Sequence, residues 1–214
     1  MQLWRFAKSL EPFGYALNRW HPPAPKPKER LLYEAFDTDG PTAVMLERAA
    51  IERSRRPGTA SVGVWNGLEG RQGAVFLVGY SQSGLSTVSL QMGAVSVALG
   101  YSHAAKLIEE ALTIWPALTV ELAPYRYSAD SKQIFPDRPG VGWMLYLPRR
   151  IEFEQVPEAR MIRHVKDLTG TEGTIIISEI DGPFDADNPE HVKVANSIEI
   201  RLADQDLLPR YADL

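Results

Sequence analysis

The chain contains no cysteine, which excludes disulfide bonds and metal sites with thiolate ligands. It also lacks long hydrophobic runs: a membrane span needs about 20 consecutive apolar residues, and no stretch reaches that length. Near the N-terminus, Trp4, Phe6 and Leu10 are separated by Arg5 and Lys8, so the continuous apolar segment of a secretory signal is missing. These absences predict a soluble protein of the reducing cytoplasm.

Motifs of several large families are missing as well. The sequence has no Walker loop, no Gly-x-Gly-x-x-Gly fingerprint, no His-Glu-x-x-His motif and no EF-hand loop. None of the four histidines has a partner at the spacing of metal ligands. They are His21, His103, His164 and His191. The formal net charge of -4 also lacks the strong positive sign of nucleic-acid binders. We therefore predict no cofactor, no metal and no direct nucleic-acid partner.

What the sequence does contain predicts an α+β fold. With 214 residues and 44% hydrophobic content the chain can bury a complete core, and we expect a single α+β domain spanning residues 1–214. Strand-like runs follow one another and helices are few. This pattern favours a mostly antiparallel sheet with a few helices packed on it over a doubly wound parallel fold. The expected strands are 60–65, 74–80, 85–91, 94–99, 118–122, 142–147, 151–155, 160–165 and 174–180.

Glycines indicate how the first strands connect. Between Gly63 and Gly100 glycine recurs among β-type runs, and Asn66-Gly67 and Ser83-Gly84 are dipeptides typical of hairpins. This segment therefore predicts an antiparallel meander. The later run of isoleucines from Gly173 is short, β-branched and bounded by Asp181-Gly182-Pro183, which is typical of a strand covered on both faces.

Three stretches have helical periodicity. The first begins after Pro41 and ends before Pro57, and the second is capped by Ser102 and ends before Pro116. The third begins at Asp187, which would form a capping box with Glu190 three residues later. Its apolar face consists of Val192, Ala195, Ile198 and Leu202. Each helix is expected to lie on the sheet.

Residues 21–28 read His-Pro-Pro-Ala-Pro-Lys-Pro-Lys. Proline at this density disfavours both a helix and a central strand, so the segment predicts an extended surface connection. The alternative is a proline-rich ligand for another protein.

Ser81 offers one hypothesis for catalysis. A hydrophobic strand leads into Gly79-Tyr80-Ser81-Gln82-Ser83, which is similar to the nucleophile elbow of serine hydrolases. An elbow needs glycine on both sides of the serine and a helix after it, whereas this chain has Ser83 at the second glycine position and continues with a strand-like alternation. A hairpin turn is the alternative that the sequence favours. Acid and base partners that follow in chain order are Asp137 with His164, and Asp181 with His191.

An acidic run crosses the end of the isoleucine strand, the following turn and the start of the last helix. Its members are Glu179, Asp181, Asp185, Asp187 and Glu190, with no basic residue among them. Three explanations remain open: a solvated turn with local capping, a negative patch that faces a basic partner, or a metal site. As a partner-binding surface we single out Asp181, Asp185, Asp187 and Glu190.

Five segments carry a resemblance to a known family. They are Ser61–Gly67, Gly142–Leu147, Gly173–Ser178, Phe184–Asn188 and Leu202–Pro209. Together they resemble the immunity protein 52 family of bacterial polymorphic toxin systems. The resemblance extends over the whole chain and is clearest in its C-terminal third. None of the five segments is a catalytic signature.

The resemblance implies an α+β cytoplasmic protein that is not an enzyme. It implies binding and neutralisation of a cognate toxin encoded beside it, often one delivered by type VI secretion and of a restriction-endonuclease-like class. The mechanism would be stoichiometric occlusion. A nuclease presents basic residues to phosphate, so the acidic segment from Asp181 to Glu190 is our hypothesis for the surface that occupies its groove. The resemblance transfers no residue-level contacts.

Overall fold

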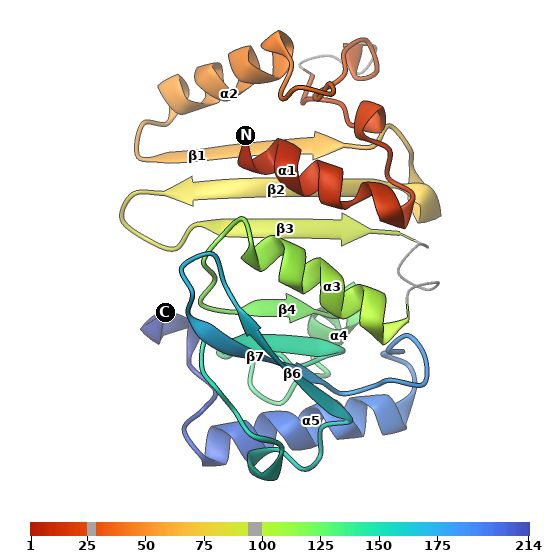
Figure 1. Ribbon diagram of the computed structural model, residues 1–214, viewed down its shortest axis with the longest axis vertical. Coiled ribbons are helices and arrows are strands. Elements are labelled where there is room, and N and C mark those ends of the chain that lie inside the picture. Colours follow the sequence, from red (N-terminus) through yellow and green to blue (C-terminus); the bar gives the residue numbers. More distant parts are fainter. Residues whose placement is uncertain (25–28, 94–99) are drawn as a thin grey trace. The chain divides into compact units, whose positions relative to one another are not determined.

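The computed structural model describes residues 1–24, 29–93 and 100–214 (Figure 1). The chain forms two compact units, residues 1–97 and 98–214, which are described here one at a time. Helices and two antiparallel sheets make up these units, so the predicted α+β class is confirmed. The expectation of a single domain stays a prediction.

The first unit is built on a three-stranded antiparallel sheet in the order β1-β2-β3. Hydrogen bonds pair neighbouring strands in register, with Val78 opposite Val62 on one side and opposite Val88 on the other. The strands are β1 (Thr59–Trp65), β2 (Ala74–Ser81) and β3 (Thr87–Met92). The predicted meander is therefore confirmed over these residues. The further strand expected at 94–99 lies outside the described residues.

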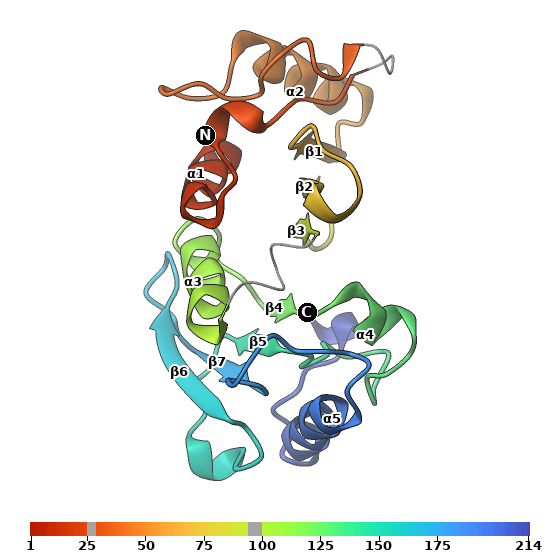
Figure 2. The same ribbon diagram turned by 90° about the vertical axis from the view of Figure 1, so that its right-hand side faces the viewer.

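Aromatic side chains form the core of the first unit. Phe76 of β2 is fully buried, and its ring contacts Phe6 at 5.6 Å and Trp20 at 4.8 Å between centroids. Phe6 belongs to α1 (Gln2–Ser9), a helix that the sequence patterns did not predict and that covers one face of the sheet (Figures 1 and 2). The predicted helix after Pro41 is α2 (Ala43–Arg55), which contacts β1.

The proline-rich segment 21–28 is described only in part, because residues 25–28 lie outside the described residues. At its start, the backbone of His21 pairs with Trp65 at the end of β1 through hydrogen bonds of 2.7 and 3.1 Å. The described beginning of the segment is therefore attached to the sheet of the first unit.

The second unit contains a four-stranded antiparallel sheet in the order β4-β5-β7-β6. The isoleucine run forms β7 in the interior of this sheet, and Ile175, Ile176 and Ile177 are all fully buried. A strand covered on both faces is thus confirmed. The strands are β4 (Val120–Leu122), β5 (Met144–Leu147), β6 (Met161–Lys166) and β7 (Glu172–Ile177).

Helices α3 (Tyr101–Leu112) and α5 (Pro189–Asp204) lie on opposite sides of this sheet (Figure 2). Helix α5 buries Ala195, Ile198 and Leu202, as its periodicity predicts. A short helix that was not predicted, α4 (Tyr125–Ala129), lies beyond β4. Among the residues that the structure describes, no helix combines the length and apolar character needed to cross a membrane.

Three local predictions are wrong. The strand expected at 151–155 is absent, because Glu152 and Gln155 form a capping box around a 3-10 turn, Phe153–Gln155. Helix α3 begins two residues earlier than expected, with Gly100 at its N-cap and no side chain capping it, so Ser102 is not the cap. The cap of α5 is Asn188 rather than Asp187, for a reason that its surroundings explain below.

Candidate functional site

The predicted site residues lie in the connection from β7 to α5 and in the first turn of that helix. We call residues 181–190 the acidic loop. Along it, Phe184 and Ala186 are buried whereas Asp185 and Asp187 are exposed, and Asp181 and Glu190 are exposed as well. The backbone therefore alternates between apolar anchors and outward carboxylates.

The apolar anchor of the acidic loop is Phe184. Its ring packs edge-on against Tyr127 of α4 with centroids 5.5 Å apart, and at 5.7 Å from the ring of His191. Because the anchor is 4% exposed, the loop cannot move away without exposing an aromatic ring to water. The carboxylates on either side are consequently presented in a defined conformation.

Polar contacts close the second half of the loop. The carboxylate of Asp185 accepts a 2.9 Å hydrogen bond from the backbone N–H of Asp187. Its carbonyl accepts from Asn188 N–H at 3.1 Å, and the side chain of Asn188 in turn accepts from Glu190 N–H at 3.0 Å. The cap of α5 therefore belongs to Asn188, one residue beyond the predicted position.

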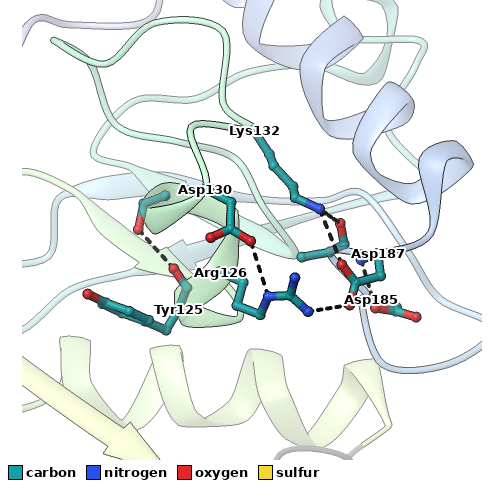
Figure 3. Close-up of polar contacts among 8 residues, drawn as sticks. Tyr125, Arg126, Asp130, Lys132, Asp185 and Asp187 are labelled. Carbon is teal, nitrogen blue, oxygen red and sulfur yellow. Dashed lines mark hydrogen bonds and ion pairs between the residues drawn. The ribbon is translucent and has the colours of Figure 1, made fainter.

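Two cations come from outside the acidic loop to Asp187 (Figure 3). The guanidinium of Arg126 in α4 donates to Asp187 and, at 3.1 Å, to Asp130. The ammonium of Lys132 lies 3.3 Å from the other oxygen of Asp187 and donates to the carbonyl of Ala186 at 2.6 Å. Asp187 is held by these two partners, which explains why it does not turn back to cap the helix.

The negative charges of the other carboxylates in the loop are less neutralised by basic side chains. Among the described residues, no basic side chain forms an ion pair with Asp181 or Asp185. Glu190 lies 3.9 Å from Lys193, and both side chains are largely exposed, so this pair contributes little. Of the four predicted site residues, three thus keep an open negative charge and Asp187 does not.

Buried Glu179 and half-buried His191 form a pair beneath the acidic loop. The imidazole Nε2 lies 3.4 Å from Glu179 Oε2. The other oxygen of Glu179 accepts from the backbone N–H of Asp181 at 2.6 Å, and Nδ1 of His191 accepts from the backbone N–H of Asp185 at 3.0 Å. This pair therefore holds two of the exposed acidic residues by their backbones.

A buried carboxylate, Glu199 of α5, organises the segment next to the loop. Its oxygens accept hydrogen bonds from the hydroxyl of Tyr127 at 2.7 Å and from the backbone N–H groups of Ile134 and Val141 at 2.8 and 2.9 Å. Burial raises the pKa of Glu199 above its ordinary value. Sequence reasoning missed this residue, although a charge directly after Ile198 on the apolar face of α5 is a recognisable signal.

The geometry around Ser81 does not provide a nucleophile elbow. Ser81 is the last residue of β2, and the chain continues through a turn into β3, so no helix follows it. Ser81 therefore lies where β2 enters the hairpin turn to β3, which is the alternative that the sequence favours. The proposed partner acid Asp137 is paired with Arg210 at 2.7 Å, and His164 Nε2 contacts the carbonyl of Ile151 at 3.0 Å.

Within the described part of the chain, no group of three or more His, Asp or Glu side chains is arranged to hold a metal ion. Comparison with known protein families finds no family model that matches the chain. Comparison with curated proteins finds no match either. The acidic loop, with its apolar anchors and its exposed carboxylates, is therefore a candidate site that rests on geometry alone.

Proposed function

We propose that the chain is an immunity protein that binds and neutralises a cognate secreted toxin, a nuclease of restriction-endonuclease-like class, by stoichiometric occlusion. The observation that carries this proposal is the acidic loop, which presents Asp181 and Asp185 without ion pairs to basic residues within the described part of the chain, and Glu190 with only the exposed 3.9 Å pair to Lys193. The resemblance of the sequence to immunity proteins supplies the class of partner.

The distribution of charge along the chain supports a basic partner. Residues 98–214 contain 19 acidic and 12 basic side chains, whereas residues 1–97 contain 8 acidic and 11 basic ones. The modest net charge of -4 is thus the sum of a positive charge on the first unit and a larger negative charge on the second unit. A surface of one sign raises the rate of encounter with a surface of the opposite sign and disfavours partners of like charge.

A nuclease offers such a surface, because it must neutralise the phosphates of its substrate with Lys and Arg side chains. Carboxylates that dock in this groove would exclude the nucleic acid. The rigid support matters because a preordered loop loses little conformational entropy on binding. Occlusion of this kind needs no catalytic group in the inhibitor.

The first test is survival of cells that express the toxin encoded beside this protein, with and without the protein itself. We expect rescue, and a one-to-one complex of the two purified proteins in calorimetry. A toxin that kills equally well in the presence of the protein, with no complex in calorimetry, would refute the proposal.

The second test locates the interface. Replacing Asp181, Asp185 and Glu190 together by alanine is expected to weaken binding of the toxin by about tenfold or more, because each open carboxylate that meets a cation contributes on the order of 1 kcal/mol. The matched control replaces Glu154, Asp204 and Asp213, three exposed carboxylates outside the acidic loop, with the same change in net charge. Equal affinities of the two triple variants would place the interface elsewhere.

A further inference from the structure

His191 occupies an unusual position beneath the acidic loop. Its Nδ1 accepts a hydrogen bond from the backbone N–H of Asp185 at 3.0 Å. A backbone N–H can only donate, so Nδ1 must carry a free electron pair. The neutral imidazole therefore has its proton on Nε2, the nitrogen that lies 3.4 Å from the carboxylate of Glu179.

Protonation of His191 would make the contact between Nδ1 and the N–H of Asp185 repulsive. The imidazolium carries N–H groups on both nitrogens, so Nδ1–H would face the N–H of Asp185 and two donors would oppose each other. At the same time Nε2–H would gain a charged contact with Glu179. The imidazole would keep its partner in the protein interior and release its partner in the acidic loop.

The groups around the imidazole come from three directions. Glu179 follows β7, Asp181 and Asp185 belong to the loop, and the ring of Phe184 packs on one side. The ring of Phe184 also packs edge-on against Tyr127 of α4. The nearby cations Arg126 and Lys132 are engaged with Asp187. Among the described residues no cation forms an ion pair with Glu179, so its charge is available to an imidazolium.

We propose that His191 is a positioning residue that makes the shape of the acidic loop depend on pH. With neutral His191 the loop is held at Asp181, through Glu179, and at Asp185, through His191. With protonated His191 the backbone N–H of Asp185 loses its acceptor, while the Asp181 end stays held and Phe184 remains the anchor. The consequence for binding of a basic partner rests on the proposed function, whereas the change in the loop itself does not.

The test that is independent of any partner uses nuclear magnetic resonance of the isotope-labelled full chain between about pH 5 and pH 8, the range in which histidines commonly titrate. We expect the amide signal of Asp185 to shift with the same midpoint as the ring of His191. Its protection against hydrogen exchange should fall about tenfold on protonation, as loss of one hydrogen bond implies. If the chemical shift and the exchange protection of the Asp185 amide do not change as His191 is protonated, the proposal is refuted.

Two variants separate the hydrogen bond from the charge. His191→Asn keeps an acceptor at the place of Nδ1 but does not titrate, and His191→Phe keeps a ring without an acceptor. Both lose the contact with Glu179. We expect the Asp185 amide to be protected at every pH in His191→Asn and unprotected at every pH in His191→Phe. Equal protection in the two variants contradicts the proposal. If His191→Phe does not fold, comparison of wild type with His191→Asn decides.

Binding is measured separately, with the toxin encoded beside this protein, at about pH 7.5 and about pH 5.5. Wild type should lose about tenfold more affinity in acid than His191→Asn, since only wild type loses the contact with Asp185. Equal losses would refute the link between His191 and binding. A toxin that binds at neither pH would remove the proposed function and leave the titration of the loop standing.

Discussion

At the scale of single residues, close approaches between strands decide which side chains are tolerated. Gly173 at the start of β7 lies beneath Tyr146 of β5, and a Cβ at Gly173 would be 2.3 Å from Cε2 and 2.6 Å from the hydroxyl of that tyrosine. Burial raises the pKa of Tyr146 to about 12. Its hydroxyl has no hydrogen-bond partner among the described residues. The position therefore needs glycine for space rather than for backbone freedom.

We expect Gly173→Ala to lower the free energy of unfolding by about 1–3 kcal/mol, because the ring of Tyr146 has no room to move aside in a packed sheet. Urea denaturation measures this change. The control is Gly182→Ala, since a Cβ there meets no atom within 4 Å. Loss of stability in Gly182→Ala but not in Gly173→Ala would show that the packing at Tyr146 is misjudged.

The raised pKa of Glu199 predicts how the stability of the fold depends on pH. Its pKa is raised from 4.5 chiefly by burial, against the lowering effect of its hydrogen bonds. A carboxyl with a raised folded pKa stabilises the fold below its unfolded pKa and loses that contribution as pH rises through the folded value. Replacing Glu199 by Gln should therefore cost most near pH 4 and progressively less as pH rises.

Urea denaturation of wild type and Glu199→Gln between about pH 4 and pH 7 measures this difference. Glu121, whose pKa is raised chiefly by burial and to a lesser degree by the charge of Glu199, is present in both proteins, so the part of its effect that comes from burial cancels in the comparison. A cost that grows with pH would mean that the hydrogen bonds from Tyr127, Ile134 and Val141 outweigh the effect of burial.

At the scale of elements, the start of α5 is determined by contacts with other segments. Asp187 pairs with Arg126 and Lys132, which leaves Asn188 to cap the helix. The local pattern of Asp187 and Glu190 is compatible with a capping box, but ion pairs across the fold compete for the same carboxylate. Residues from α4 and its following loop thereby set the boundary between the acidic loop and the helix.

The cap can be tested by two alanine variants. We expect Asn188→Ala to cost about 1 kcal/mol of stability and to expose the amide of Glu190 to hydrogen exchange, because the side chain that accepts from it is lost. Asp187→Ala removes only exposed ion pairs and should leave that amide protected. Faster exchange at Glu190 in Asp187→Ala alone would return the cap to Asp187.

At the scale of the whole molecule, the two units differ in charge, with an acidic excess in residues 98–214 and a basic excess in residues 1–97. The overall net charge conceals this difference. A partner that binds the acidic loop would be steered by the local charge of the second unit rather than by the net charge of the chain.

We therefore expect the rate of association with the proposed toxin to fall about tenfold or more between about 0.02 M and about 0.5 M salt, because exposed charges are screened over a shorter distance at high salt. Stopped-flow mixing measures this rate. The dependence should weaken in the variant that lacks Asp181, Asp185 and Glu190. A rate that salt does not change would exclude steering by this surface.

The sequence by itself determined the class of fold and the central elements. Alternating and continuous apolar runs predict the meander of the first unit, the buried strand β7 and the apolar face of α5, because these patterns reflect local geometry and burial. The acidic run was also visible, since its members are neighbours in the chain. Short elements such as α1 and α4 were missed, because helices of eight and five residues are not stable by themselves and depend on tertiary contacts.

Only the tertiary structure decided which of the acidic residues remain open. Arg126 and Lys132 are more than fifty positions from Asp187, and no local pattern predicts that they neutralise it. The burial of Glu199 and the contact of His191 with the backbone of Asp185 depend in the same way on how α5 packs. The sequence shows which residues carry a charge. Which of these charges are neutralised by an opposite charge depends on distances between segments that only the fold brings together.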